Sequence, residues 1–364
     1  FGYMPIFSRL GIKREFCLLF GSRPTAPAIN PGETAARILV IKLSALGDFV
    51  LAMGAMKAVR KHHRSAHITL LTTPPFERFA KASPYFDSIE TDGRPGDIRA
   101  TRALLRRIRK ADFDMIYDFQ TSGRTANYFK ALNLPGRAPP LWSGHVSGCA
   151  FLHDNPRRGS MHSIDRLAEQ LTVSGVGPES GWTPETLPMP DLSWIRGAFN
   201  DPPRLRPAFF NLTLPYMLLI PGASAHRSAK RWPEERYAEL AGRVADAGIL
   251  PVLIGGTAEG KIAHAIAKAE PRVKNIVTRT DFFQIATLAE QATFVVGNDT
   301  GPMHMATLAG APGVALFATN ESDPDKAAPR GSTVMIVHGR TLAEVSTDDV
   351  WRAVQALGCI PSQT

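Results

Sequence analysis

Three segments of the sequence place ionisable side chains beside a glycine turn, each after an apolar run and before a helical pattern. The first is Ser44-Ala-Leu-Gly-Asp48, which follows the apolar run 37–43. Aspartate is a preferred residue at a helix start because its carboxylate accepts backbone N–H bonds, so Asp48 can be a cap. A carboxylate that faces a cleft can also take the proton of a substrate hydroxyl as a general base. The residues alone leave both roles open.

The second segment predicts a binding site for phosphate. The turn Pro221-Gly-Ala-Ser224 contains Gly222, and Lys230-Arg-Trp-Pro233 then leads into a helical pattern. Proline suits the first turn of a helix, where its missing N–H costs nothing. The free amides and the dipole of a helix start favour an anion, and the Ser224 hydroxyl and the Lys230 charge add to this. The alternative is a basic turn that is merely exposed.

The third segment is Gly297-Asn-Asp-Thr-Gly-Pro-Met-His304, again after an apolar run. Asp299, Thr300 and the amides that follow are expected to face a ligand above the strand ends. His304 falls one helical turn after Thr300, on the same side. Such a segment can also be only a turn with a cap, and His304 can be a structural histidine. Two helix starts suited to anions, both after strands, favour a ligand site.

Several other kinds of site lack their sequence signature. The run Ile254-Gly-Gly-Thr-Ala-Glu-Gly260 does not have the glycine spacing of a dinucleotide-binding turn, and no phosphate-binding Walker loop or G-x-S-x-G hydrolase turn is present. The three cysteines are far apart and odd in number, which argues against a disulfide framework or a zinc site. We therefore expect chemistry without a metal or a cofactor.

Alternating strand and helix patterns must position these segments. Strands are predicted at 37–43, 67–71, 114–119, 216–220, 250–255, 293–297 and 313–317. Helices are predicted at 48–62, 233–247, 258–269 and 282–291, with another that begins near Gly301. The glycine- and proline-rich segment 135–163 is interpreted as loops. This alternation is typical of doubly wound α/β domains, whose ligands bind at the carboxyl ends of the strands.

The length of 364 residues predicts two domains, 36–200 and 201–364, the second with a C-terminal helix. A proline-rich segment at about 181–215 is the predicted linker. Residues 1–35 form an N-terminal extension, interpreted either as a helix on a membrane surface or as a loosely docked segment. No apolar run is long enough for a membrane span, and no secretory signal is recognised, so a cytoplasmic location is expected.

The charge is divided unequally along the chain. Residues 1–200 carry 26 Lys and Arg against 17 Asp and Glu, whereas residues 201–364 carry 16 of each. A basic field raises the local concentration of anionic partners, for which nucleic acid, an anionic membrane surface and a phosphorylated acceptor are the candidates. A solvated basic surface is the simpler explanation for 102–110 alone.

The three segments together resemble the ADP-heptose:lipopolysaccharide heptosyltransferases, glycosyltransferase family 9. That family has a Ser-x-x-Gly-Asp turn after the first strand, a Lys-x-Trp-Pro segment in the second domain and an Asp-Thr-Gly-x-x-His motif. Here these are Ser44–Asp48, Lys230–Pro233 and Asp299–His304, in the same order. The segments 117–120 and 253–259 add to the likeness, which covers about 38–317. The resemblance implies a GT-B fold, in which two Rossmann-like domains face each other across a cleft.

The resemblance also implies roles for individual residues. Asp48 is the base for the acceptor hydroxyl, and Lys230 stabilises the departing diphosphate in a single displacement with inversion and without a metal. The donor-binding residues are then Gly222, Ser224, Lys230, Glu259, Asp299, Thr300, Gly301 and His304, with Glu259 at the ribose. The acceptor-binding residues are Ser44, Gly47, Gln120 and Arg124.

The expected partners are a nucleotide-diphosphate sugar, here ADP-heptose, and an anionic lipid-linked saccharide of the lipopolysaccharide inner core, either lipid A–Kdo or the first heptose. The basic first domain suits that acceptor and a peripheral contact with the cytoplasmic face of the inner membrane, and nucleic acid is not an expected partner. Ala225 and His226 stand where some members of the family have threonines, so a transferase with another donor or acceptor is an alternative. A non-catalytic nucleotide-sugar-binding module and a nicotinamide-dependent oxidoreductase are the others.

Overall fold

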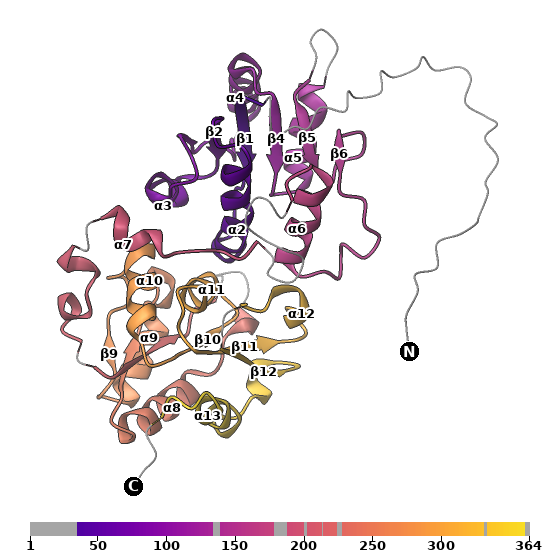
Figure 1. The fold of residues 1–364 in the computed structure, drawn as a ribbon. Helices are drawn as coiled ribbons and strands as arrows, with labels where there is room; N and C mark the ends of the chain where they lie inside the picture. Colours follow the sequence, from indigo (N-terminus) through magenta and orange to yellow (C-terminus); the bar gives the residue numbers. More distant parts are fainter. Residues whose placement is uncertain are drawn as a thin grey trace, which may run out of the picture.

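The computed structural model describes residues 35–133, 139–177, 188–199, 202–212, 214–223, 228–330 and 333–360. These residues form two α/β halves, each built on one sheet of six parallel strands (Figure 1). The proposed N-terminal extension, except residue 35, and Ser224 to His226 lie outside the described residues.

The first half contains the sheet with the order β3-β2-β1-β4-β5-β6. Its strands are β1 (Arg37–Ile41), β2 (His67–Leu71), β3 (Ser88–Glu90), β4 (Met115–Asp118), β5 (Leu141–Gly144) and β6 (Phe151–Leu152). Its helices are α2 (Leu46–His62), α3 (Glu77–Ala82), α4 (Ile98–Ala111), α5 (Gly123–Leu132) and α6 (Ser163–Val173), and a 3₁₀ turn, η1 (Pro74–Phe76), precedes α3.

The central strand β1 is apolar because both faces of its sheet are covered. Ile38 and Val40 point to one face, where they belong to the core formed with α2 and α6. Leu39 and Ile41 point to the other face and belong to the core formed with α4 and α5. Since side chains alternate along a strand, a sheet buried on both faces needs the uninterrupted apolar run that the sequence shows.

The second half has the sheet order β12-β11-β10-β7-β8-β9. Its strands are β7 (Tyr216–Ile220), β8 (Leu250–Leu253), β9 (Lys274–Asn275), β10 (Val295–Asn298), β11 (Gly313–Ala318) and β12 (Val334–Gly339). Its helices are α8 (Glu234–Asp246), α9 (Gly260–Ala269), α10 (Phe282–Gln291), α11 (Gly301–Leu308), α12 (Pro324–Ala327) and α13 (Thr347–Ala356). The 3₁₀ turns η5 (Ser228–Lys230), η6 (Thr257–Glu259) and η7 (Leu342–Glu344) connect them.

The segment predicted as a linker contains α7 (Trp194–Ala198), η3 (Pro203–Leu205) and η4 (Pro207–Phe210). Both α7 and η3 contact α10 of the second half. The boundary between the domains near residue 200 stays a proposal.

The interpretation of 135–163 as loops is wrong, because β5 and β6 lie within this segment. The many glycine, proline and serine residues of this segment weaken its local strand pattern. Trp142 is 1% exposed and stacks edge-on against Phe129, with ring centroids 5.4 Å apart. Ser143 pairs with Tyr117 of β4, so tertiary packing overrides the weak strand preference of the segment.

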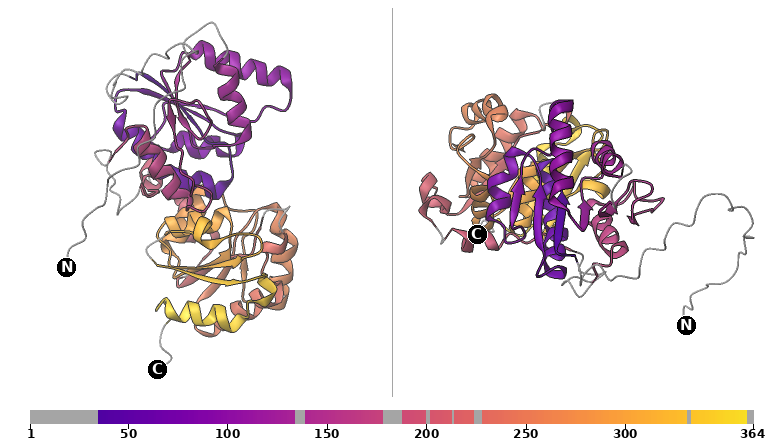
Figure 2. Two further views of the ribbon diagram at one scale, coloured as in Figure 1. Left: turned by 90° about the vertical axis from the view of Figure 1, so that its right-hand side faces the viewer. Right: turned by 90° about the horizontal axis from the view of Figure 1, so that it is seen from above.

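The two halves meet along helices α2 and α11, which pack against each other. An aromatic group continues this contact, since Phe76 and Phe79 of the first half lie 6.2 and 5.9 Å from the ring of Phe282 on α10. The left view of Figure 2 shows the halves as two bodies that touch along this boundary.

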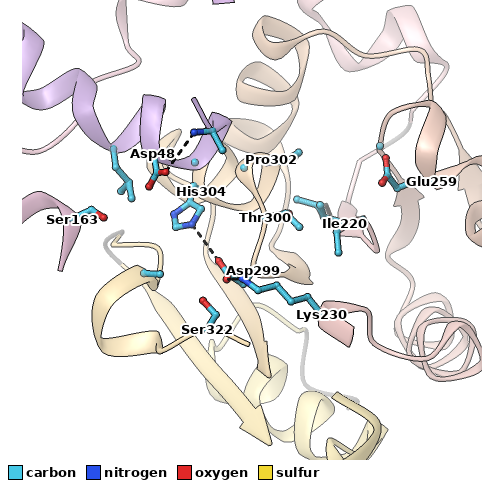
Figure 3. Close-up of a pocket in the computed structure, with 18 residues that line it drawn as sticks. Asp48, Ser163, Ile220, Lys230, Glu259, Asp299, Thr300, Pro302, His304 and Ser322 are labelled. Carbon is cyan, nitrogen blue, oxygen red and sulfur yellow. Dashed lines mark hydrogen bonds and ion pairs between the residues drawn. The ribbon is translucent and has the colours of Figure 1, made fainter. Parts of the chain in front are cut away.

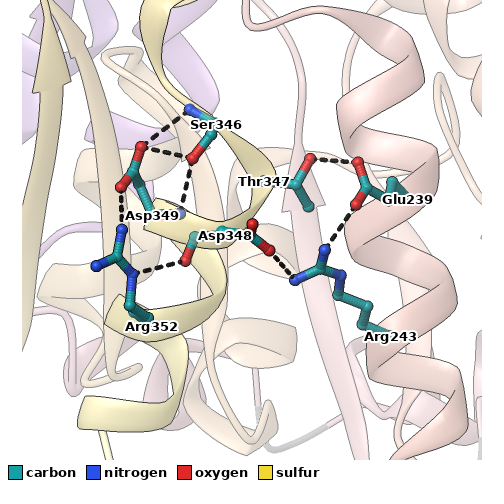
Figure 4. A network of polar contacts seen from close by, with 7 residues as sticks. All are labelled: Glu239, Arg243, Ser346, Thr347, Asp348, Asp349 and Arg352. Carbon is teal, nitrogen blue, oxygen red and sulfur yellow. Dashed lines mark hydrogen bonds and ion pairs between the residues drawn. The ribbon is translucent and has the colours of Figure 1, made fainter.

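A polar network fixes the last helix, α13, beside α8 (Figure 4). Arg243 of α8 contacts Asp348 at 2.7 Å, and Glu239 accepts a hydrogen bond from Thr347 Oγ1 at 2.6 Å. Exposed ion pairs stabilise little individually, so the apolar contacts of Val350 and Val354 in the core carry the packing of α13.

Among the described residues, no helix combines the length and the apolar character that a membrane span requires.

Candidate active site

A cavity of about 550 Å³ lies between the halves, at the carboxyl ends of β1, β7, β8 and β10 (Figure 3). Both halves contribute to its wall, as expected for ligand sites in parallel sheets. The residues predicted for the site that line it are Gly47, Asp48, Gly222, Lys230, Glu259, Asp299, Thr300, Gly301 and His304.

Asp48 enters the cavity from the first turn of α2. Its side chain is exposed, and its Oδ2 atom lies 3.5 Å from the backbone nitrogen of Ala45, the residue that precedes the helix. At this distance the contact is weak, so the carboxylate remains available to a ligand. Figure 3 shows His304 between Asp48 and Asp299. The capping contact and a position facing the cavity therefore occur together.

Lys230 and Asp299 form a buried pair in the opposite wall. Lys230 Nζ lies 2.5 Å from Asp299 Oδ2, and each side chain is 9% exposed. His304 Nε2 lies 3.6 Å from the other carboxylate oxygen. Burial acts to raise the pKa of the Asp299 carboxyl, but the contacts with His304 and Lys230 outweigh it and lower the pKa to about 2. Asp299 is therefore anionic at neutral pH and fixes the position of the Lys230 ammonium group.

The start of α11 presents backbone N–H groups at the same wall. Thr300 is the N-cap, but its side chain does not cap the helix, because Thr300 Oγ1 donates to the carbonyl of Asn298 at 3.2 Å. Pro302 lies in the first turn, where it lacks an N–H in any case. The uncapped first turn, with its dipole, makes this end of the cavity favourable for an anion.

Two glycines allow the close approach of α2 and α11. A Cβ atom at Gly301 would lie 2.5 Å from the Cβ of Leu46, and one at Gly47 would lie 2.8 Å from Cδ2 of His304. Neither position can take a side chain without a shift of the atoms that it would meet. The distance between Asp48 and the second half thus depends on both glycines.

Replacing Gly301 with alanine is expected to destabilise the protein by about 1–3 kcal/mol, because the new methyl group overpacks the contact with Leu46. The melting temperature and the turnover of this variant would both be lower than those of Gly260→Ala. Gly260 also begins a helix, but a Cβ atom there would meet nothing within 4 Å. Equal melting temperatures for the two variants would contradict this account of the interface.

Glu259 lies at the far end of the cavity from Asp48, as Figure 3 shows. Its Oε2 atom accepts a hydrogen bond from the Gly256 amide at 2.8 Å, which fixes the carboxylate at the start of η6. A Cβ atom at Gly222 would lie 3.0 Å from the Glu259 side chain, so Gly222 leaves the space that this side chain uses.

The predicted acceptor-binding residues do not all line the main cavity. Gly47 lines the main cavity, whereas Ser44 and Arg124 do not. Gln120 Oε1 accepts from the amides of Leu43 and Ser44 at 2.9 and 3.2 Å, so it joins the end of β4 to the turn before α2. Arg124 donates to the carbonyl of Pro95 at 3.4 Å.

Gln120 also lines a smaller pocket of about 200 Å³ that shares Asp48 and Ser163 with the main cavity. The sequence-based prediction missed three cations of this pocket, Lys42, Arg158 and Arg166. Lys42 was the only one with a local signal, as a charge at the end of the apolar run 37–43.

Ser163, Ser322 and Ala327 of the main cavity were missed as well. A contact between the halves places Ser163 and Ala327, because His162 Nε2 donates to the carbonyl of Ala328 at 2.9 Å. Burial lowers the pKa of His162 to about 4, so this ring is neutral at pH 7.

A family model described as glycosyltransferase family 9 (heptosyltransferase) matches residues 101–349. The chain is 31% identical over 304 residues to the lipopolysaccharide heptosyltransferase 2 of Escherichia coli (strain K12), a match that covers 79% of this chain and 84% of that protein.

Two solved structures share the fold at low identity. The E. coli ADP-heptose lps heptosyltransferase II has a TM-score of 0.68 and 21% identity, over 88% of this chain and 98% of that one. The E. coli heptosyltransferase WaaC with ADP has a TM-score of 0.66 and 19% identity, over 88% and 99%. The GT-B fold expected from the sequence is confirmed by these likenesses and by the two parallel sheets.

Proposed function

Because the chain belongs to glycosyltransferase family 9, the heptosyltransferase family, we propose that it moves heptose from ADP-heptose to the lipopolysaccharide inner core. The acceptor is lipid A–Kdo or the first heptose. The names of the relatives support this substrate class, and one solved relative holds ADP. The observation that carries the proposal is that Asp48 of the first half lines one cavity with Lys230 and the start of α11 from the second half.

In this proposal the donor lies along the cavity, with its nucleotide at one end and its heptose at the other. The cavity volume of about 550 Å³ suits a nucleotide sugar. Glu259 at the far end binds the ribose, and the diphosphate lies between Lys230 and the uncapped start of α11. The heptose then lies near His304 and Asp48, with its anomeric carbon toward the first half. The Ser224 hydroxyl remains a proposed phosphate ligand from outside the described residues.

The proposed reaction is a single displacement. Asp48 accepts the proton of the acceptor hydroxyl while that oxygen attacks the anomeric carbon from the face opposite ADP. The bond from the anomeric carbon to the diphosphate breaks, so the configuration inverts and ADP leaves. Lys230 and the amides at the start of α11 stabilise the charge that develops on the leaving group. In this proposal these groups take the place of a metal ion.

The test is transfer by purified protein with ADP-heptose and a lipid A–Kdo acceptor, measured as the mass gain of one heptose unit, with and without EDTA. We expect equal turnover in both and no turnover with nucleotide sugars that carry other bases or sugars. Preference for another donor would favour the alternative transferase of the same family. Tight binding of ADP-heptose without transfer to either acceptor would favour a non-catalytic binding module.

We further propose a peripheral contact with the cytoplasmic face of the inner membrane through helix α4. Arg99, Arg102, Arg106 and Lys110 are exposed along this helix, and no carboxylate of a described residue forms an ion pair with them. Ile98, at the start of the helix, is 62% exposed. Each such cation near an anionic lipid surface contributes about 1 kcal/mol of binding.

Replacing all four cations with glutamine is therefore expected to weaken binding to vesicles that contain anionic phospholipid by about a hundredfold or more. Turnover of a short acceptor without acyl chains would stay the same. Lys261→Gln with Lys268→Gln on α9, both exposed in the second half, is the matched control. Equal vesicle binding by the two sets of variants would contradict the assignment of α4.

A further inference from the structure

Asn298, the last residue of β10, is fully buried beside the donor cavity. Its side chain has no exposed surface and does not line the cavity, whereas the next residue, Asp299, does. β10 pairs with β7 so that Gly297 lies opposite Ile220, which brings Asn298 level with the turn that follows β7. A buried polar side chain must find its hydrogen-bond partners within the protein.

The protein satisfies the whole hydrogen-bonding capacity of the Asn298 amide group. Oδ1 accepts from the Tyr237 hydroxyl at 2.9 Å and from the Trp232 backbone N–H at 3.3 Å. Nδ2 donates to the carbonyls of Pro221 and Gly222 at 2.9 and 3.1 Å. Because a carbonyl only accepts and a backbone N–H only donates, these partners fix the orientation of the amide group. Among side chains of this length, only asparagine offers two donors and two acceptor positions.

The first segment that Asn298 fixes is the turn 221–222 after β7. Gly222 lines the cavity and lies against the side chain of Glu259. Both carbonyls of the turn are bonded to Asn298, so the position of the turn relative to β10 is fixed. The main chain of Asn298 also supports the start of α11, because its carbonyl accepts from Thr300 Oγ1 at 3.2 Å.

The second segment is the one that carries Lys230. Trp232 follows Lys230 by two residues, and its backbone N–H donates to Asn298 Oδ1. The Trp232 ring is fully buried, and its Nε1 donates to the carbonyl of Val345 at 2.9 Å. The chain beside Lys230 is therefore anchored to β10 through Asn298, in addition to the ion pair between Lys230 and Asp299.

We infer that Asn298 is a positioning residue for the donor. Its amide group holds the turn 221–222, the chain that carries Lys230 and the start of α11 at fixed distances from one another, so that one diphosphate can contact all three. The inference rests on the proposed transferase function and deepens it. Asn298 touches neither the donor nor the reacting atoms, and it acts only through the segments that it joins.

Two substitutions of Asn298 test this role. Asn298→Asp keeps the shape of the side chain and its accepting contacts, but it removes both donated bonds and turns an acceptor oxygen toward the carbonyls of the turn. Asn298→Ser shortens the side chain so that it no longer reaches the turn, and it adds no charge. We expect Asn298→Asp to raise the Kd of ADP about ten- to a hundredfold and Asn298→Ser to raise it about tenfold, because the buried carbonyls lose their partners and the turn shifts.

The readout that separates positioning from stability is a difference between the two substrates. The KM for ADP-heptose should rise together with the Kd of ADP. The KM for the acceptor should stay within about threefold, since the proposed acceptor contacts come from the first half and distant sites are nearly independent. Titration calorimetry gives the Kd, and circular dichroism shows that each variant is folded.

Val350→Ala is the control for lost stability in the second half. Val350 of α13 is fully buried in the core and does not line the cavity. Removing its methyl groups lowers the melting temperature, because it leaves a cavity in the core. The Kd of ADP should nevertheless stay within about twofold of the native value, since this site is separate from the donor site.

A native Kd of ADP in either folded Asn298 variant, with only a lower melting temperature as in Val350→Ala, would overturn the inference. Failure of both variants to fold would overturn it as well, because Asn298 would then serve the fold as a whole. A native protein that binds no ADP would instead count against the proposed function. The two failures are therefore distinguishable.

Discussion

Replacing Asp48 with asparagine is expected to lower kcat for heptose transfer by about a hundred- to ten-thousandfold, the usual range for loss of a general base. The asparagine side chain has nearly the same size but accepts no proton from the acceptor hydroxyl. Affinity for ADP should stay within about twofold, because the proposed diphosphate contacts come from the second half. Turnover and ADP binding, measured on the same preparation, give both numbers.

The control for this variant is Asp97→Asn. Asp97 caps α4 by accepting a hydrogen bond from the Ala100 amide at 2.8 Å, and it does not line the cavity. Both variants make the same chemical change at a helix start, so a shared loss of stability reports capping alone. If the Asp48 variant lost less than about tenfold in kcat, the exposed carboxylate would be only a cap.

Replacing Lys230 with methionine is expected to lower kcat about a hundred- to a thousandfold, or roughly 3–4 kcal/mol of transition-state stabilisation. The variant also removes the partner of the buried Asp299 carboxylate, and breaking such a pair typically costs about 3–5 kcal/mol of stability. A low melting temperature would therefore accompany the loss of activity.

The double variant Lys230→Met with Asp299→Asn separates these two effects. Neutralising both partners removes the uncompensated charge, so the melting temperature should return close to that of the native protein. Turnover should stay low, because the cation that stabilises the leaving diphosphate is still missing. A double variant with native turnover would show that Lys230 serves stability only.

The fold was predictable because its signals are local. Each of the three chemistry-bearing segments follows an apolar run and begins a helix, and parallel sheets bring such junctions to one edge. β2 and β7 lie at the predicted residues. β5 was not found, because its serine and glycine are loop formers. Pairing with β4 and the packing of Trp142 on Phe129 place it in the sheet.

Part of the candidate site was also predictable from the sequence. Asp48, Lys230, Asp299 and His304 line one cavity, although their roles stay predictions. Arg158 and Arg166 carry no local signal, because each is one of many arginines in a basic half. They become distinctive only where the fold places them beside Lys42 in one pocket. The dependence of the α2–α11 contact on Gly47 and Gly301 likewise appears only in the folded chain.

One donor molecule is expected to lie between a carboxylate of the first half and a cationic wall of the second. A crystal structure with a non-transferable ADP-heptose analogue tests it most directly. We expect the diphosphate within hydrogen-bonding distance of Lys230 Nζ and of the amides at Thr300 and Gly301, with the anomeric carbon facing Asp48. An analogue bound with its sugar turned away from Asp48, or outside the cavity between the halves, would contradict the account.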